Sequence, residues 1–220
     1  MIASELVSDA VFPVQPGEKL SSLQEKMREA QLEHFPVVRY TQYLGLLNED
    51  DVAAQLKENP DALVESMTLE HISIYGGAHI YDVIQAFYLH QIDVLPVIDD
   101  KQHFLGMITS GDLLDYFAVL TGADQPGGII VLELNNRDNS LAHIAQIVES
   151  DNAQIMSSYV RTFPDSTRIE VTLKLNRTEI SSIVAAFLRY DYKVKATFND
   201  QRGQDTASDR YEQLMNYLNM

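Results

Sequence analysis

The pattern of apolar and polar positions in the first half of the chain occurs twice, and each copy predicts the same order of elements. Leu20, Leu23 and Met27 recur at helical spacing with charged residues between them, which predicts a helix with one buried face. Two short apolar runs bounded by polar turns follow, and they predict a pair of strands. In the first copy the predicted elements are a lead-in helix over 1–9, an extended stretch over 12–14, a helix over 19–31, strands over 35–38 and 43–47, and a helix over 50–56. In the second copy they are a lead-in helix over 63–67, an extended stretch over 72–75, a helix over 80–87, strands over 94–98 and 104–108, and a helix over 113–120.

The two copies align residue by residue along their strands. Pro96 follows Pro36 by 60 residues, and Gly106 follows Gly45 by 61. A repeat of this length that contains both strands and helices is typical of a duplicated domain and not of a solenoid.

The pattern changes after a turn-rich stretch that contains Pro126, Gly127 and Gly128. Apolar and polar residues then alternate strictly over 168–175, as in a sheet with one face in water. The predicted order is β-α-β-β-α-β, with strands over 129–134, 153–163, 168–175 and 192–198 and helices around 141–148 and 180–187. The predicted organisation is two repeats over 1–60 and 61–122, a linker over 123–128, a domain over 129–198 and a tail over 199–220. Within the tail, four apolar residues at helical spacing fit either a short docking helix or a frayed end: Tyr211, Leu214, Met215 and Leu218.

In each repeat a glycine-containing strand runs directly into a helix, and this junction is the candidate binding site. The first amides of a helix lack partners inside the helix, and the helix dipole makes its start electropositive, so an anion is favoured there. Thr109 is expected to cap the helix or to bond a phosphate, and Asp112 to accept hydrogen bonds from a pair of hydroxyls, as on a ribose. The alternative is an ordinary capping pair with nothing bound.

These residues resemble a known family. The strands Phe35-Pro36-Val37-Val38 and Leu95-Pro96-Val97-Ile98, and the Gly-x-x-polar-x-x-Asp junctions that begin at Gly45 and Gly106, look like a tandem pair of cystathionine-β-synthase (CBS) domains. The resemblance covers about half of the chain. It implies a sensor module without chemistry of its own, which forms disc-like dimers and binds adenosine-containing ligands in clefts between the repeats.

The resemblance also implies which residues line the clefts. The better-matched cleft is formed by Ile72, Ser73, Val94, Leu95, Pro96, Thr109 and Asp112. A weaker second site is formed by Phe12, Phe35, Pro36, Asn48 and Asp51, because Asn48 stands where threonine or serine is usual. Only Arg39 and Lys101 are obvious cations near the predicted clefts, so AMP or S-adenosylmethionine is favoured over ATP.

The segment over 129–198 resembles an ACT domain, a small ferredoxin-like regulatory fold that often pairs sheets between subunits. Such domains bind amino acids at the first strand-to-helix turn, here Asn136, Arg137 and Asn139. Asn139 stands where glycine is usual, and its side chain obstructs close approach of a ligand to the backbone. An oligomerising role is therefore favoured over amino-acid binding. Two CBS domains followed by an ACT-like domain is also the order in acetoin-utilisation B-type proteins, and the expected fold class is α+β.

Composition and charge narrow the function. With 45% apolar and 22% charged residues the chain is typical of a soluble globular protein. The net charge of −16, with 6 Lys and Arg against 20 Asp and Glu up to Pro126, argues against nucleic-acid binding. There is no cysteine, and neither a bilayer-spanning apolar run nor a signal-peptide pattern is found, so a cytoplasmic location without membrane association is expected.

No catalytic or metal-binding pattern is found in the sequence. The six histidines lack metal-ligand spacing, and the acidic pairs Asp50-Asp51 and Asp99-Asp100 are explained more simply as turn residues. We therefore expect no enzyme, no metal site and no certain cofactor. The sequence predicts a homodimeric regulatory protein that binds an adenosine compound and acts on a partner it does not identify. The alternative is an interaction scaffold whose clefts are vestigial.

Overall fold

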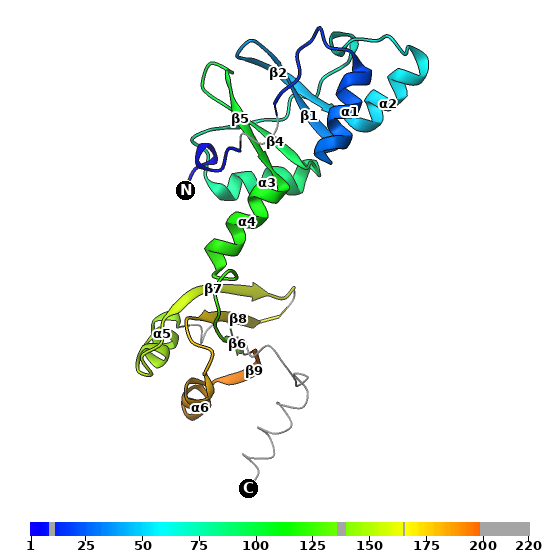
Figure 1. The fold of residues 1–220 in the computed structure, drawn as a ribbon. Coiled ribbons are helices and arrows are strands. Elements are labelled where there is room, and N and C mark those ends of the chain that lie inside the picture. Colours follow the sequence, from blue (N-terminus) through cyan, green and yellow to red (C-terminus); the bar gives the residue numbers. More distant parts are fainter. Residues whose placement is uncertain (9–11, 136–139, 165, 199–220) are drawn as a thin grey trace. The chain divides into compact units, whose positions relative to one another are not determined.

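The computed structural model describes residues 1–8, 12–135, 140–164 and 166–198. The chain divides into two compact units, Met1–Tyr116 and Phe117–Met220 (Figure 1). The fold is mixed α and β, as the sequence pattern predicts.

The first unit contains the two predicted repeats, except for the end of the last helix, which belongs to the second unit from Phe117 on. The first comprises α1 (Leu20–Ala30), β1 (His34–Arg39), β2 (Gln42–Asn48) and α2 (Glu49–Glu58), and the second comprises β3 (Ile74–Tyr75), α3 (Ile80–His90), β4 (Val94–Ile98), β5 (Phe104–Thr109) and α4 (Ser110–Thr121). β1 and β2 form an antiparallel pair, as do β4 and β5, and β3 adds in parallel to β4. The predicted order of these helices and strands is confirmed, whereas the predicted extended stretch over 12–14 contributes only an isolated parallel bridge between Val14 and Val37.

The lead-in segments are shorter than predicted. Instead of helices over 1–9 and 63–67 the structure has single 3₁₀ turns, η1 (Ala3–Glu5) and η2 (Val64–Ser66). Residue 9 lies outside the described residues. The backbone of η1 is held by hydrogen bonds to the second repeat, because the Ala3 and Ser4 N–H groups donate to the carbonyls of Ala78 and Gly76. These contacts take the place of helical ones.

Each lead-in packs on the opposite repeat, and this explains the matched glycines. Glu70 exchanges backbone hydrogen bonds of 2.8 and 3.0 Å with Leu46 in β2, and the Ser8 N–H donates to the Met107 carbonyl in β5. A Cβ placed on Gly45 lies 2.6 Å from the Leu69 Cβ. A Cβ on Gly106 collides in the same way with Val7. Both glycines also have positive φ, 154° and 144°, so an L side chain is disfavoured at both positions.

The lead-in segments are exchanged between the repeats, and their buried side chains lie in the core of the opposite repeat. Ala3 and Leu6 lie in the core of the second repeat with Ile80, Val83 and Ile108. Ala62 and Val64 lie instead in the core of the first repeat, with the buried face of α1. Each repeat is therefore completed by residues from the lead-in that precedes the other one.

The second unit is a four-stranded sheet covered by helices on one face. Its elements are β6 (Ile129–Asn135), α5 (Leu141–Glu149), β7 (Ile155–Thr162), β8 (Arg168–Leu175), α6 (Ser181–Arg189) and β9 (Lys193–Phe198). The strand order is β7-β8-β6-β9, and all neighbours are antiparallel. This β-α-β-β-α-β arrangement is ferredoxin-like, as predicted. Its assignment as an ACT domain stays a prediction. No helix in the described part of the chain is long and apolar enough to span a membrane.

Candidate functional site

The junction between β5 and α4 brings Thr109 and Asp112 together. Asp112 Oδ2 accepts hydrogen bonds from the Thr109 N–H and from the Thr109 hydroxyl, both at 2.7 Å. Thr109 Oγ1 accepts in turn from the Asp112 N–H at 3.1 Å. The two residues thus form a reciprocal capping box, which is the simpler of the two sequence-based interpretations.

The capping box leaves two polar groups at the helix start without a partner. Within the described ranges no hydrogen bond involves Asp112 Oδ1 or the Gly111 N–H, whereas the Ser110 N–H donates to the Asp93 carbonyl at 2.9 Å. Gly111 is exposed, and a Cβ there would meet only Thr109 Oγ1, at 3.5 Å. A backbone donor of an exposed residue and a carboxylate acceptor of the half-buried Asp112 therefore lie together at a helix N-terminus.

The other residues predicted for this cleft differ in their exposure. Val94 pairs directly with Thr109 across the β4–β5 ladder, but its side chain is buried, as are those of Leu95 and Pro96. Their side chains form part of the core, so only their backbone is placed to face a ligand. Ile72 and Ser73 are half-buried.

Ile72 is also tied to the first repeat. Its carbonyl accepts a hydrogen bond of 2.5 Å from the hydroxyl of Tyr43 in β2. Burial, together with the nearby Glu70 carboxylate, raises the pKa of Tyr43, so this hydroxyl stays protonated at neutral pH.

Arg39 and Lys101 do not lie near the helix starts, contrary to the sequence-based expectation. Arg39 ends β1 opposite Gln42, whereas the junction end of that hairpin is at Asn48. Lys101 lies in the turn between β4 and β5, at the end of the hairpin opposite Thr109. A strand advances about 3.3 Å per residue, so each cation is separated from its junction by the length of a hairpin.

The junction of the first repeat is built differently. The Asn48 side-chain oxygen accepts a hydrogen bond of 2.8 Å from the Asp50 N–H and so caps α2. Asp51, which matches Asp112, is exposed. Phe35 and Pro36 are buried in or beside the core of this repeat, and Phe12 is exposed. Two of the five residues of the predicted weaker site, Phe35 and Pro36, therefore have buried side chains, and the site stays a prediction.

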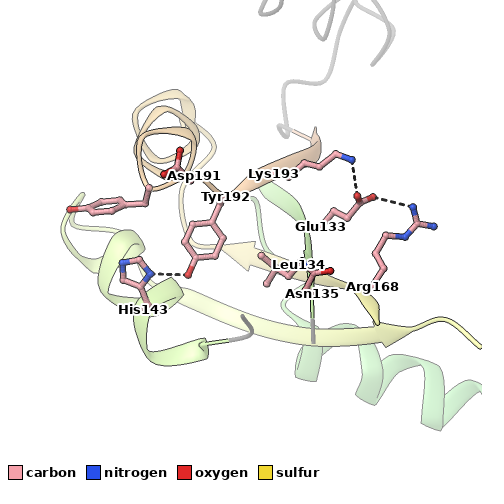
Figure 2. A pocket seen from close by; sticks show the side chains of 9 residues that line it. Glu133, Leu134, Asn135, His143, Arg168, Asp191, Tyr192 and Lys193 are labelled. Atoms are coloured by element: carbon pink, nitrogen blue, oxygen red, sulfur yellow. Dashed lines mark hydrogen bonds and ion pairs between the residues drawn. The ribbon is translucent and has the colours of Figure 1, made fainter. Parts of the chain in front are cut away.

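A pocket of about 470 Å³ lies in the second unit, and sequence reasoning did not identify it (Figure 2). It is lined by Glu133, Leu134, Asn135, His143, Arg168, Tyr190, Asp191, Tyr192 and Lys193. These residues come from the end of β6, from α5, from the start of β8 and from the connection into β9. No local motif links them, so only the fold reveals the pocket. The predicted turn residues Asn136, Arg137 and Asn139 lie outside the described residues.

Glu133, Arg168 and Lys193 stand on one side of this pocket, and the rings of His143 and Tyr192 stand on the other, together with Asp191 (Figure 2). The Glu133 carboxylate accepts from Lys193 Nζ at 2.7 Å and lies 3.7 Å from an Arg168 nitrogen. The Lys193 hydrogen bond lowers the pKa of Glu133, so this carboxylate is charged at neutral pH. Opposite, His143 Nδ1 is 2.8 Å from the Tyr192 hydroxyl, whose pKa is raised by burial.

Comparison with known families identifies the first unit. The family model for the CBS domain matches residues 3–58 and 63–119, which together make up just over half of the chain. The chain belongs to the CBS domain family. The two matched CBS ranges correspond to the two structural repeats, and the Thr109–Asp112 and Asn48 junctions each lie within one of them.

Individual relatives match over the CBS region. The chain is 28% identical over 117 residues to inosine-5'-monophosphate dehydrogenase of Halobacterium salinarum. This match covers 51% of this chain and 23% of that protein. The chain thus spans about a quarter of the length of this curated relative. A CBS domain pair/ACT domain protein of Thermotoga maritima is 22% identical, with a TM-score of 0.48, and the match covers 53% of this chain and 96% of that one. CBSX2, solved in complex with AMP, is 16% identical, with a TM-score of 0.47, and the match covers 53% of this chain and 95% of that one.

Proposed function

We propose that this protein is a non-catalytic regulatory module that binds an adenosine-containing ligand at the junction between β5 and α4 and transmits the binding to a partner protein. Membership of the CBS family supports a regulatory role. The observation that carries the proposal is the pair of unpartnered groups at this junction, the Gly111 N–H and Asp112 Oδ1, among the described residues. The amide suits a phosphate oxygen or a carboxylate, and the carboxylate oxygen suits a ribose hydroxyl.

The charge of the surroundings favours a ligand with little negative charge. Arg39 and Lys101 lie at the far ends of their hairpins and are not placed to neutralise a polyphosphate. The segment up to Pro126 carries 20 acidic and 6 basic residues, and this excess repels additional negative charge. AMP or S-adenosylmethionine is therefore favoured over ATP.

The thermal stability of the full chain tests this proposal. We expect AMP or S-adenosylmethionine to raise Tm more than ATP or NAD does, because the acidic surroundings favour a ligand with little negative charge. A ligand at 100 times its Kd stabilises a protein by about 2.7 kcal/mol. Asp112→Ala is expected to abolish the ligand-induced shift. The matched control is Asp51→Ala, which removes the corresponding exposed carboxylate from α2 and is expected to keep the shift. Unchanged Tm with all four compounds would leave the ligand-free scaffold as the function.

We also propose that the protein is a cytoplasmic homodimer. Among the helices of the first unit, α3 carries an exposed apolar face with Tyr81, Tyr88 and Leu89, whereas the outward side of α1 is charged. Exposed large apolar side chains gathered on one helix are typical of protein interfaces. Analytical ultracentrifugation checks this: Tyr88→Glu is expected to produce monomers, and Glu29→Lys on α1 to leave the dimer intact. A monomeric parent protein would overturn the assignment.

The pocket of the second unit favours a second ligand, and we propose that this ACT-like unit accepts a small zwitterion. A volume of about 470 Å³ lies within the ordinary range for small-molecule sites. Glu133 and the pair Arg168 and Lys193 offer charges of both signs on one wall, as an amino acid requires. Thermal shifts with the twenty amino acids test this, with Lys193→Met as the variant expected to remove any shift. If none of them stabilises the protein, the oligomerising role predicted for this domain remains.

A further inference from the structure

A continuous series of hydrogen bonds connects the start of α4 in the second repeat with the start of α2 in the first. The Ser110 N–H donates to the Asp93 carbonyl at 2.9 Å. The Asp93 carboxylate accepts from the backbone of the first repeat, with Oδ2 2.7 Å from the Glu33 nitrogen and Oδ1 3.1 Å from the His34 nitrogen. Oδ1 also lies 2.7 Å from Nδ1 of the His34 ring.

The series continues through the far side of the His34 ring. His34 Nε2 lies 3.1 Å from the Asn48 side-chain nitrogen, and the Asn48 oxygen accepts from the Asp50 N–H in the first turn of α2. The Glu33 carbonyl accepts from the Glu49 N–H at 2.8 Å, which gives α2 a second tie to the same segment. His34 is only 7% exposed, so water competes little for these contacts.

The donors and acceptors in this series fix the tautomer of the neutral ring. Because the Asn48 oxygen is used by the Asp50 N–H, the amide nitrogen is the atom that faces His34. An amide nitrogen only donates, so Nε2 of His34 accepts and carries no proton. The proton of the neutral ring is therefore on Nδ1, where it is donated to Asp93.

The duplicated pattern does not repeat this arrangement. At the repeat spacing of 60 residues, Val94 takes the place of His34, and Glu33 takes the place of Asp93. Val94 has no polar group in its side chain. The connection is therefore a particular feature of this chain, added to the symmetric hairpins.

We propose that Asp93 and His34 are positioning residues that couple the two strand-to-helix junctions, so that a change at one helix start alters the other. This coupling is a property of the ligand-free protein. The consequence of the coupling for a bound ligand rests on the proposed function. The experiment that tests the coupling uses no ligand, so failure of the coupling is distinguishable from failure of the proposed ligand binding.

Amide hydrogen exchange of the full chain, followed by NMR at single residues, tests the coupling. Asn48→Ala removes the cap of α2 and the partner of His34, so the Asp50 amide is expected to exchange faster. The remote readout is the Ser110 amide, whose hydrogen bond goes to Asp93 and not to Asn48. Its exchange is expected to rise roughly two- to thirtyfold, the range found for coupling along contact networks. An unchanged Ser110 amide would overturn the proposal.

Two backgrounds and one control separate coupling from general loss of stability. When Asn48→Ala is added to the His34→Leu variant, the exchange rate of the Ser110 amide is expected to stay the same, because leucine makes no hydrogen bonds. When it is added to His34→Gln, the rate is expected to rise as in the parent protein, because glutamine retains one donor and one acceptor. Asn59→Ala removes a comparable contact, to the Asp61 N–H, beyond the other end of α2. An equal response of Ser110 to this control, or a response that persists in His34→Leu, contradicts the proposal.

If a variant fails to fold, the ¹⁵N spectrum of the parent protein provides the test. A neutral His34 ring that is protonated on Nε2 would rule out this series of hydrogen bonds.

Discussion

The Asp93 carboxylate accepts hydrogen bonds from two backbone amides and one ring of the first repeat, so its charge affects how the two repeats are held together. Burial alone raises the pKa of Asp93. The His34 ring and the Glu33 N–H outweigh it, and the net effect is a pKa below the ordinary value of 3.8. A carboxyl group with a depressed pKa contributes stability that is present above its unfolded-state pKa and is lost as pH falls through its folded-state pKa.

Replacement of Asp93 by asparagine should therefore have an effect that depends on pH. At pH 7 we expect Asp93→Asn to lower the free energy of unfolding by about 1.5–3 kcal/mol, the contribution typical of hydrogen bonds to a charged group. Below pH 3.8 the parent protein progressively loses the same contribution, so the two free energies should converge. Urea denaturation at a series of pH values measures this. A difference that stays constant from pH 7 to pH 3 would show that the charge of Asp93 is unimportant.

At the residue scale, the sequence predicts local partners and misses distant ones. Thr109 and Asp112 are three positions apart, and at a helix start that spacing specifies a capping box. Asp93 meets Glu33 and His34 across about 60 residues, and no local rule marks such a contact. Arg39 and Lys101 were misplaced for a related reason, because proximity in sequence to a strand does not tell which end of the hairpin holds the site.

At the scale of elements, the exchange of lead-in segments explains why each repeat needs a glycine in its last strand. Hydrophobic spacing predicts α1 to α4 and β1 to β5, but it does not reveal that the lead-ins are single turns, or that η1 packs on the second repeat and η2 on the first. The matched glycines were visible in the sequence as a pattern. Their reason is the close approach of Val7 to Gly106 and of Leu69 to Gly45, which depends on the tertiary fold.

A side chain at Gly106 is expected to displace the lead-in segment. Gly106→Ala places a methyl group against Val7 at a backbone φ of 144°, and we expect a loss of about 1–3 kcal/mol, as for other overpacked sites. Gly77→Ala is the control, because a Cβ there meets nothing within 4 Å. Chemical denaturation of both variants measures the difference, and hydrogen exchange of the Ser8 amide reports the lead-in directly. Equal stability of the two variants would contradict this account of the glycine.

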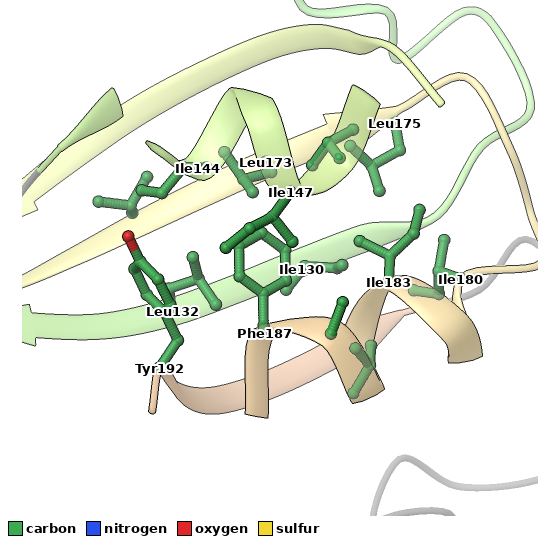
Figure 3. Close-up of a cluster of buried hydrophobic side chains, with 14 of the residues drawn as sticks. Ile130, Leu132, Ile144, Ile147, Leu173, Leu175, Ile180, Ile183, Phe187 and Tyr192 are labelled. Carbon is green, nitrogen blue, oxygen red and sulfur yellow. The ribbon is translucent and has the colours of Figure 1, made fainter. Parts of the chain in front are cut away.

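At the scale of the molecule, the structure contains separate hydrophobic cores in its two units. The core of the second unit is formed by α5, α6 and the inner face of the sheet, with Phe187 among its completely buried residues (Figure 3). Among the residues that the structure describes, the cores of the first unit share none with it. The change of hydrophobic pattern after Pro126 predicts a second domain. Apolar and polar residues over 168–175 alternate with a period of two, and the order of elements found in the two repeats does not continue.

Separate cores are expected to unfold separately. Calorimetry of the full chain should show two transitions, since each unit has a core of its own. Phe187→Ala should lower the transition of the second unit alone, with a loss of about 3–5 kcal/mol, and Leu23→Ala should lower the transition of the first unit by about 2–5 kcal/mol. Each variant serves as the control for the other. A single transition that both substitutions shift by similar amounts would mean that the units unfold as one cooperative body, despite their separate cores.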